Sequence, residues 1–558
     1  MCGIAGCIAS DISSIHEPTF SHMKKAISYH GKDDEGEWTD GGHVYFCHSR
    51  LSIIDIDTGH QPMTDSSGRY AIVYNGEIYN YIELKEEYKK QGAAFKTQSD
   101  TEVILEGFKL KGHEICRDLN GMYAFAIWDC KEKRLFMARD RLGKKPLFWA
   151  ASEKSLFFSS TLDSFHGIEG WNGELSRPGI ILYQTTGAFL GNYTVYKNAT
   201  SFPAASYAYV SLHNLRPDIT RYWSLDFSKK YRNKLNNLIE QYEDILTDAV
   251  RIRLRSDVPL ALSFSGGVDS GTIAAICTRK LNAKIKSFVI DYHTEENASE
   301  DVLNAVKVAE HLGLDLQFIN YDYGKKLMDE LDRAYHFYDQ PCQLLPLVYI
   351  FHLYEAMKSY ATVVLSGNGA DELFTGYIGD QSVRQKDIIL SATRWLHPIF
   401  MKTRFKHYFY TPFPKAFAEI LKNQASGFDG DTAAIDEANT AIDRFINGAI
   451  ECSVRSVLDM KMYYNIFCST AAANYILSDI SGLAAQVEVR SPYLDYRMVE
   501  FAAKLPHHYK VRNIFTSGSN KYLPKRYYAK YVANRLAWSR KKWLSYNMPF
   551  SLYIKNGS

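Results

Sequence analysis

The sequence predicts a fold in two parts. Residues 1–205 are expected to form layered antiparallel sheets, residues 206–230 a connector, and residues 231–558 a parallel α/β sheet with a helical C-terminal region. The 558 residues exceed what one core usually holds, since domains average about 150 residues. The first part has short apolar runs separated by turn residues, which is typical of antiparallel sheets. The second part alternates apolar strands with glycine turns and helices, which is typical of parallel sheets.

In the first part, the clearest strands are expected over residues 70–74 and 122–128. Each precedes residues that favour a turn, Asn75-Gly76 after the first and Asp129 after the second. Regular strand and turn spacing of this kind favours stacked antiparallel sheets. The pattern then changes near residues 203–223, where an extended connector is expected.

The second part begins with a helix-like run over residues 235–255. Apolar strands are then expected over residues 258–264, 285–290 and 361–365, with a helix around 273–277. Because the carboxyl ends of parallel strands open to one crevice, we expect the turns that follow the first and third strands to share a ligand site. Residues from about 380 onward have a mostly helical and irregular pattern.

Composition excludes several classes of protein. The chain has 65 Lys and Arg against 63 Asp and Glu, which argues against a general nucleic-acid or membrane-surface binder. It has no apolar stretch of about 18 residues that could span a membrane. The N-terminus lacks the basic and apolar regions of a signal peptide, and nine scattered cysteines form no CxxC pair. We therefore expect a cytoplasmic protein without nucleic-acid partners.

The start of the chain, Met1-Cys2-Gly3-Ile4, carries a candidate nucleophile. If Met1 is removed, Cys2 has a thiol and a free α-amine on one carbon. An α-amine has a pKa of about 7.7–8.0, so it can accept the thiol proton at neutral pH without a histidine. Such a nucleophile suits attack on a carboxamide. The alternative is that Cys2 is a small buried hydrophobic residue.

The first glycine turn is a candidate phosphate site. Gly266 and Gly267 let the backbone approach a ligand, and the helix that follows presents unpaired N–H groups. Ser265 and Ser270 add hydroxyl donors. Asp269 would repel a bare phosphate, so it predicts a Mg²⁺ ion between carboxylate and phosphate oxygens. The loop is not a Walker A motif, and the alternative is an ordinary strand-to-helix turn.

A second turn of similar character, Ser366-Gly367-Asn368-Gly369-Ala370-Asp371, follows the third strand. We expect Asp269 and Asp371 to flank one Mg²⁺ ion. Lys521 is a candidate for stabilising charge on a leaving pyrophosphate, with a solvated lysine as the alternative.

These segments together resemble the glutamine-dependent asparagine synthetases over nearly the whole chain. The start is similar to a class II glutamine amidotransferase domain, an N-terminal-nucleophile hydrolase with stacked sheets between helices. The resemblance implies that Arg50, in His48-Ser49-Arg50-Leu51, clamps the glutamine α-carboxylate. It also implies that Asn75 and Gly76, in the segment Asn75-Gly76-Glu77, face the oxyanion, and that Asp100 holds the glutamine amine. Asn75 and Glu77 are further expected to bind glutamine.

The same resemblance identifies the turn at Ser265 as the pyrophosphatase loop of a synthetase domain. Such a domain adenylates a carboxylate, releases pyrophosphate, and lets ammonia displace AMP. It implies ATP and Mg²⁺ as requirements, glutamine and a carboxylate as substrates, and allows a homodimer. An interior tunnel is expected between the two sites. Two further segments resemble the family, residues 488–495 and the tail with Arg540, Lys541, Lys542 and Pro549. The residues expected to bind ATP or pyrophosphate are Leu262, Ser265, Gly266, Gly267, Asp269, Ser270, Ile290, Ser366, Gly367 and Lys521.

Three departures from the family pattern weaken the step from amidotransferase to asparagine synthetase. Asn368 replaces a glutamate, and an asparagine cannot act as a general base. Residues 28–36 alter a cationic loop near the glutaminase pocket. The span from Tyr377 to Asp479 is long, which leaves room for a different acceptor pocket, with residues 341–346 as candidate lining.

Three functions follow from these observations. The first is amidation of a carboxylate, with aspartate as the default acceptor. The second keeps this chemistry but amidates a uronic-acid sugar or another cell-surface or natural-product precursor. The third is a catalytically silent regulator that binds glutamine or nucleotide, for which Asn368 is the only support.

Overall fold

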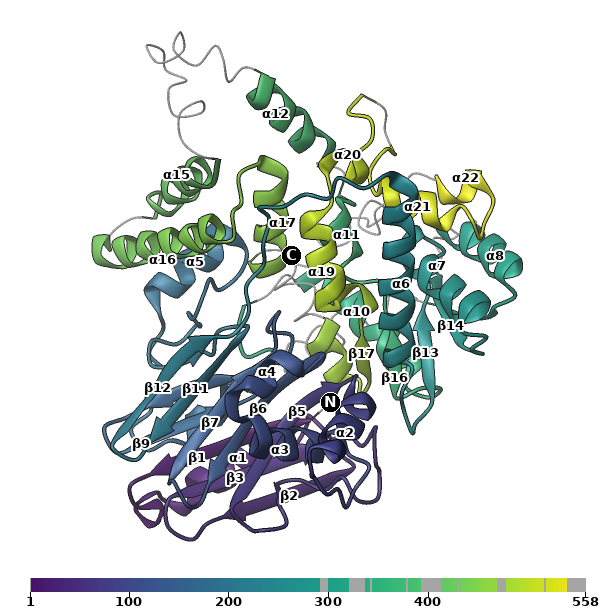
Figure 1. The fold of residues 1–558 in the computed structure, drawn as a ribbon. Coiled ribbons are helices and arrows are strands. Elements are labelled where there is room, and N and C mark those ends of the chain that lie inside the picture. Colours follow the sequence, from purple (N-terminus) through teal and green to yellow (C-terminus); the bar gives the residue numbers. More distant parts are fainter. Residues whose placement is uncertain are drawn as a thin grey trace, which may run out of the picture.

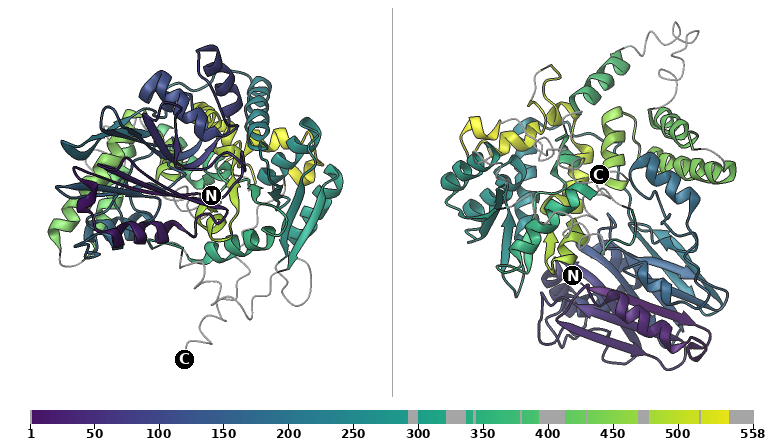
Figure 2. Two further views of the ribbon diagram at one scale, coloured as in Figure 1. Left: turned by 90° about the horizontal axis from the view of Figure 1, so that it is seen from below. Right: turned by 180° about the vertical axis from the view of Figure 1, so that it is seen from behind.

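The computed structural model describes residues 2–291, 300–320, 337–341, 344–377, 380–392, 413–428, 431–468, 478–515 and 518–538. Two antiparallel sheets are stacked in the N-terminal part, and a parallel sheet surrounded by helices follows (Figure 1). The views from below and from behind also show these two parts packed side by side (Figure 2). The predicted fold class is confirmed.

The N-terminal part contains two six-stranded sheets. The first has, in spatial order, β10 (Thr200–Ser201), β8 (Phe148–Ala151), β9 (Ser155–Ser159), β1 (Gly3–Ala9), β3 (Val44–Arg50) and β2 (Asp34–Thr39). The second has β12 (Asn214–Arg221), β11 (Ser206–Ser211), β7 (Arg134–Arg139), β6 (Gly121–Asp129), β5 (Tyr70–Ile78) and β4 (Met63–Thr64). Every pairing of named strands in these sheets is antiparallel.

Helices cover the outer faces of both sheets. Helix α1 (Glu17–Ile27) packs on β1 and β3, while α3 (Asp100–Lys111) packs on β5. A core that includes Ile4, Phe46 and Trp128 fills the space between the sheets. The small residues of β6 that face it, Ala124 and Ala126, let the two sheets approach closely. The result is a helix–sheet–sheet–helix sandwich with Cys2 at the start of a central strand.

Two local expectations in this part were wrong. Asn75 and Gly76 do not form a turn, because β5 continues through them and pairs Asn75 with Ala124 and Gly76 with Tyr123. The expected connector over residues 206–230 begins with a hairpin, because β11 and β12 extend the second sheet. Alternating side chains of β11 are buried and half-buried, as expected for a strand with one face on a core.

The second part is built on a parallel sheet in the order β15 (Asp315–Asn320), β14 (Lys286–Asp291), β13 (Leu260–Ser263), β16 (Val363–Leu365) and β17 (Glu488–Arg490). The three strands predicted from the sequence are β13, β14 and β16. Strand β17 comes from the region expected to be helical, and only three residues pair with β16. Leu262 lies beside Leu365 in the register of β13 and β16, so the turns after both strands start at the same edge.

Helices surround this sheet and account for most of the remaining described chain. The predicted helix over 235–255 is α6 (Leu235–Arg253). The other helices are α2 (Tyr81–Lys90), α4 (Ile115–Asp118), α5 (Arg177–Thr186), α7 (Val268–Ala275), α8 (Glu300–Leu312), α10 (Leu344–Met357), α11 (Ala370–Phe374), α12 (Asp380–Ala392), α15 (Phe413–Ala425), α16 (Thr432–Glu451), α17 (Val457–Phe467), α19 (Tyr496–Lys504), α20 (His507–Lys510), α21 (Tyr522–Tyr528) and α22 (Asn534–Ala537). Short 3-10 turns are η1 (Ile12–Ser14), η2 (Gly112–Glu114), η3 (Asp163–Gly167) and η6 (Pro492–Leu494), and α7 ends in a π turn, η4 (Ile276–Lys280).

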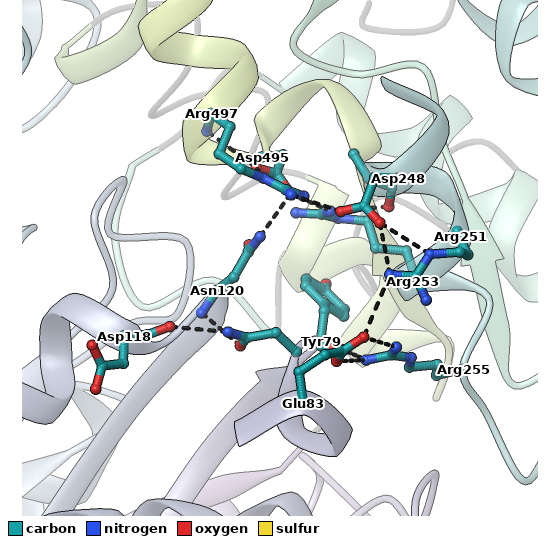
Figure 3. A network of polar contacts seen from close by, with 12 residues as sticks. Tyr79, Glu83, Asp118, Asn120, Asp248, Arg251, Arg253, Arg255, Asp495 and Arg497 are labelled. Carbon is teal, nitrogen blue, oxygen red and sulfur yellow. Dashed lines mark hydrogen bonds and ion pairs between the residues drawn. The ribbon is translucent and has the colours of Figure 1, made fainter. Parts of the chain in front are cut away.

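A polar network joins the two parts (Figure 3). Asp495, fully buried, accepts hydrogen bonds from Arg253 Nη1 at 2.9 Å and from Asn120 Nδ2 at 3.0 Å. Arg255 forms two hydrogen bonds with Glu83, at 2.5 and 2.6 Å. Asn120 and Glu83 belong to the N-terminal part, whereas Asp495 and Arg255 belong to the second part, so the Asn120–Asp495 and Glu83–Arg255 contacts cross the domain junction.

No helix in the described ranges is long and apolar enough to cross a membrane.

Candidate active sites

Cys2 lies immediately before β1, and its thiol is half-buried. Its Sγ is 3.9 Å from the carbonyl oxygen of Leu51, at the end of the adjacent strand β3. Burial raises the pKa of the Cys2 thiol, while the positive charge of Arg50 opposes this shift. A base close to the thiol is therefore needed to generate the thiolate at neutral pH.

Asn75 and Gly76 lie in β5, on the central part of the second sheet. The Asn75 side chain is buried and its Nδ2 is 3.4 Å from Ser160 Oγ, which also accepts the Ile4 N–H at 3.1 Å. The Asn75 Oδ1 has no hydrogen-bond partner among the described residues. Asn75 thus presents a polar amide beside the strand that follows Cys2.

Gly76 has a φ of 154°, and a Cβ there would lie 2.1 Å from the Met122 carbonyl oxygen. Gly76→Ala is therefore expected to separate β5 from β6, lowering the free energy of unfolding by about 2–4 kcal/mol and reducing glutamine hydrolysis. Denaturant unfolding and glutamate release measure both effects. Gly42→Ala, where a Cβ meets nothing within 4 Å, is the control. A Gly76→Ala protein as stable as the wild type would contradict this expectation.

Arg50 organises the loop that follows β3. It is 5% exposed, and its guanidinium donates to the carbonyl oxygens of Ile54 at 3.0 Å, Asp55 at 2.7 Å and Ile56 at 3.2 Å. The three carbonyls use two of its nitrogens, Nη1 and Nη2. Arg50 therefore holds the loop whose first residue, Leu51, contacts Cys2.

Asp100 begins α3 and points toward β5. Its Oδ2 accepts the Ile78 N–H and the Tyr74 hydroxyl, each at 2.9 Å. Burial raises the pKa of Asp100 to about 6, although both hydrogen bonds favour the ionised form. A cation bound beside Asp100 would favour the carboxylate.

Glu77 faces the synthetase side of the domain junction. Its Oε2 lies 3.2 Å from Arg490 Nη2, and Arg490 Nε donates to Glu488 at 2.7 Å. Burial and the nearby Glu488 raise the pKa of Glu77 well above its usual value. The guanidinium of Arg490 is fully buried between these carboxylates and the backbone carbonyls of Arg253 and Arg255. The Arg490 side chain thus connects β5 to β17.

The first glycine turn has the geometry expected of a phosphate loop. Gly267 is the residue before α7, and Gly266 has a φ of 69° with Ala305 directly behind it. Ser270 Oγ lies 3.1 Å from both the backbone N and the Oγ of Ser265, which closes the turn. The helix N-terminus therefore faces the crevice at the edge of the parallel sheet.

The second turn lies against the first, as the parallel strands predict. A Cβ at Gly367 would be 3.0 Å from the Asp269 Cβ and from the Ser270 backbone N. Lys521 Nζ lies between the two predicted metal-binding carboxylates, 2.5 Å from Asp269 Oδ2 and 2.6 Å from Asp371 Oδ1. Burial lowers the pKa of Lys521, but the two carboxylates outweigh it and raise the pKa above its usual value. Lys521 is therefore a buried ammonium ion and not a solvated side chain.

The described residues contain no group of three or more His, Cys, Asp or Glu side chains that could hold a metal ion. Asp269 and Asp371 supply two carboxylates only. This number fits Mg²⁺ bound together with substrate phosphates, which typically uses one or two carboxylates.

Asn368 Nδ2 donates to Ser478 Oγ at 2.6 Å. The residue after Ser478, Asp479, lines a cavity of about 140 Å³ that also contains Cys2 and Asn75. Its other lining residues come from both domains: Tyr29, His30, Arg139, Lys144, Pro146, Phe148, Ser160, Tyr183, Gly187, Ala188, Phe189, Tyr193, Ser201, Phe337, Tyr338, Asp339, Gln340, Pro341, Ile480 and Leu483. The cavity therefore extends from Cys2, the candidate nucleophile, to Asp479. The neighbouring residue Ser478 contacts Asn368 of the second turn.

The predicted site residues have different positions relative to this cavity. Cys2 and Asn75 line it, whereas Arg50, Glu77 and Asp100 are not among its lining residues. Leu262 is fully buried in the core beneath the first turn, and Ile290 is half-buried in β14. Of the candidate acceptor segment, Pro341 lines the cavity, and the other side chains lie outside the described residues, as do Arg540, Lys541, Lys542 and Pro549.

Several residues at these sites were not predicted. Ser160 and Lys145 carry no local motif, and their roles depend on contacts with residues 85 and 334 positions away in the sequence. The sequence places His30 in the altered loop of residues 28–36 and predicts no role for its side chain. It is buried in the cavity wall, and burial lowers its pKa to about 3, so its imidazole is neutral. Its Nε2 has no hydrogen-bond partner in the described part of the chain.

Two family models match this chain, a glutamine amidotransferase domain over residues 1–223 and asparagine synthase over residues 241–555. The glutamine-hydrolyzing asparagine synthetase 1 of Bacillus subtilis (strain 168) is 27% identical over 100% of this chain and 88% of its own length. The putative glutamine-hydrolyzing asparagine synthetase 2 of Methanocaldococcus jannaschii is 32% identical over 72% of this chain and 80% of its own length. Amidase chry2 of Gibberella zeae is 26% identical over 87% of this chain and 78% of its own length.

Proposed function

The chain belongs to the glutamine-hydrolysing asparagine synthetase family, and on that basis we propose that it amidates a carboxylate through an acyl-adenylate, with aspartate as the default acceptor. The overall reaction consumes glutamine, ATP, a carboxylate and water. It yields glutamate, AMP, pyrophosphate and the amide.

One observation carries this proposal. A single cavity is lined by Cys2 on one side and by Asp479, Ile480 and Leu483 on the other. Ammonia released at Cys2 is a nucleophile only while it is unprotonated, so a route away from bulk water preserves its reactivity. The cavity supplies the beginning of such a route toward the second turn.

In the glutaminase half, the Cys2 thiolate attacks the glutamine carboxamide, and its α-amine takes the thiol proton. The Asn75 amide and the Gly76 N–H are the proposed donors to the oxyanion. Arg50 and Asp100 are the proposed partners of the glutamine α-carboxylate and α-amine, with Glu77 nearby. The raised pKa of Asp100 supports this role, because a bound ammonium group would restore its charge.

In the synthetase half, the two glycine turns are the proposed site for the ATP phosphates. Mg²⁺, held by Asp269 and Asp371, would neutralise charge on phosphate oxygens. Lys521 would provide a fixed positive charge to the departing pyrophosphate. The remaining proposed nucleotide contacts are Leu262, Ser265, Gly266, Gly267, Ser270, Ile290, Ser366 and Gly367.

A different acceptor is the second candidate, and Asn368 favours it. The family's glutamate would carry a negative charge at this position, whereas Asn368 is neutral and donates to Ser478. A neutral amide cannot accept a proton from the attacking ammonia, and it presents a different surface to the acceptor. Uronic-acid sugars and other cell-surface or natural-product precursors are the proposed alternatives to aspartate.

An acceptor screen tests the proposal. The protein is incubated with glutamine, MgATP and one acid at a time, and glutamate, AMP and pyrophosphate are measured. Pyrophosphate that appears only with aspartate is the expected result, and pyrophosphate only with uronates supports the second candidate. Release of ADP and phosphate would exclude an acyl-adenylate. Absence of turnover with every acid would favour a silent regulator that binds glutamine or nucleotide.

We also propose a cytosolic enzyme that forms a homodimer. All cysteines of the described chain are free thiols, which suits a reducing compartment. Size-exclusion chromatography with light scattering tests the dimer, and fractionation of cells tests the compartment.

A further inference from the structure

A buried ion pair crosses the domain junction beside the cavity. Lys145 Nζ lies 2.9 Å from Asp479 Oδ1, and the Lys145 side chain is fully inaccessible to solvent. Lys145 belongs to the loop between β7 and β8, whereas Asp479 lies in the helical residues 478–484 of the synthetase domain. One partner thus comes from each domain.

The pair lies where the two walls of the cavity meet. The residues on both sides of Lys145, Lys144 and Pro146, line the cavity from the amidotransferase domain. Asp479 itself and Ile480 line it from the synthetase domain. Separation of the pair would therefore open the cavity along the domain junction.

Further contacts hold the backbone of Lys145 and the residue next to Asp479. The carbonyl oxygen of Lys145 accepts a 2.7 Å hydrogen bond from Arg139 Nε, and its N–H donates to Asp140 Oδ2 at 3.1 Å. On the other side, Ser478 accepts the hydrogen bond from Asn368 in the second turn. The pair is thus next in sequence to a residue that contacts the turn proposed to bind ATP.

The Lys145 ammonium group keeps its charge in the interior. Burial lowers the pKa of Lys145, but Asp479 and Glu488 outweigh it and raise the pKa above its usual value. Removal of one partner alone would leave an uncompensated buried charge. Replacement of both by apolar residues of similar size is often neutral for stability, which separates the role of the pair from its effect on folding.

We propose that Lys145 and Asp479 are a positioning pair that seals the interdomain cavity, so that ammonia formed at Cys2 reaches the activated carboxylate and not bulk water. This inference rests on the proposed glutamine-dependent amidation. Neither residue reacts. The pair acts by holding the loop with Lys144 and Pro146 against residues 478–484. Ammonia that escapes is protonated in water and lost to the reaction.

The test compares how glutamate and pyrophosphate formation are coupled in the wild type and in Lys145→Met/Asp479→Leu, using the acid that gives pyrophosphate in the acceptor screen. The wild type is expected to form about one glutamate per pyrophosphate. The double variant is expected to raise this ratio at least about threefold, because the open junction admits water. Pyrophosphate formation from ammonium salts is expected to stay within about twofold of wild type, since external ammonia does not need the sealed cavity.

A second interdomain pair provides a matched control. Glu83 and Arg255 also join the domains (Figure 3), but neither lines the cavity. Glu83→Gln/Arg255→Met is expected to leave the ratio at the wild-type value. Lys145→Arg, which keeps the ion pair, is expected to retain most of the coupling.

Several outcomes would overturn the inference. An unchanged ratio in the Lys145→Met/Asp479→Leu protein would do so, as would an equal rise in the Glu83→Gln/Arg255→Met control. If the double variant does not unfold cooperatively, the neutral polar variant Lys145→Gln/Asp479→Asn is measured in its place, and an unchanged ratio there counts equally against the seal. A wild type that forms no pyrophosphate with any acid would refute the proposed function, and the seal with it. If the wild type forms pyrophosphate but the double variant has the same ratio of glutamate to pyrophosphate, the seal alone is refuted.

Discussion

Cys2→Ala is expected to abolish glutamine-dependent amidation while leaving ammonium-dependent amidation within about twofold of wild type. Removal of a nucleophile typically costs about 10⁴–10⁶ in rate, and no other described cysteine lines the cavity. The synthetase turns lie in a different domain and retain Lys521, Asp269 and Asp371, so activation of the carboxylate needs nothing from Cys2. Glutamate release and pyrophosphate release, with either nitrogen donor, measure the two activities separately.

Cys130→Ala is the matched control, because Cys130 is also a half-buried free thiol but lies outside the cavity. It is expected to leave both activities unchanged. Loss of ammonium-dependent activity in Cys2→Ala would contradict the division into two sites. Intact-mass measurement of active protein adds an independent check. The mechanism requires a chain that starts at Cys2, so active material that retains Met1 would refute it.

The sequence predicted the architecture well where one strand or helix has a strong local pattern. Helix α6 and strands β13, β14 and β16 lie within a few residues of their expected positions. Helix α6 has apolar residues at helical spacing, and the three strands are short runs rich in apolar residues. Glycine turns follow β13 and β16. Strand β17 has only three residues, Glu488–Arg490, of which two are charged. Its β conformation depends on pairing with β16, which no local pattern shows.

The turn expected at Asn75-Gly76 shows how tertiary contacts override local preference. Asparagine followed by glycine is a strong turn signal in isolation. Here the glycine is required for another reason, since the Met122 carbonyl occupies the space of its Cβ. The same two residues are the proposed oxyanion donors. Asn75 and Gly76 therefore have a sequence typical of a turn but lie in a strand, at a position proposed to be functional.

Candidate site residues could be predicted when they lie in short motifs, such as Cys2, the two glycine turns and Lys521. The structure brings Lys521 to Asp269 and Asp371, a proximity across 252 residues that no motif states. Lys145 and Asp479 escaped prediction because each acts through a partner in the other half of the chain. Arg490 lies in the family-like segment 488–495, but its partner Glu77 could not be predicted from that segment. These oppositely charged residues come together only when the two domains pack, which no local sequence pattern shows.

Lys521→Met is expected to reduce pyrophosphate formation about 10²–10³-fold with either glutamine or ammonium as nitrogen donor, while glutamine hydrolysis continues. The Lys521 ammonium is already within 2.6 Å of both carboxylates, so its charge is fixed in the crevice before ATP arrives. A cation that is positioned in advance stabilises developing charge without reorganisation, which methionine cannot do. Asp269 and Asp371 would then repel the phosphates more strongly.

The structure also explains why a neighbouring lysine cannot take over. Gly376 lies where a Cβ would be 2.2 Å from the Lys521 Cε, so the backbone is shaped around this one side chain. Lys525, one turn further along α21, directs its Nζ to the Gly518 carbonyl at 2.8 Å. Lys525→Met is therefore the matched control and is expected to lose much less pyrophosphate formation than Lys521→Met. Equal losses in the two variants would mean that α21 contributes only general positive charge, and unchanged pyrophosphate formation in Lys521→Met would remove Lys521 from the proposed chemistry.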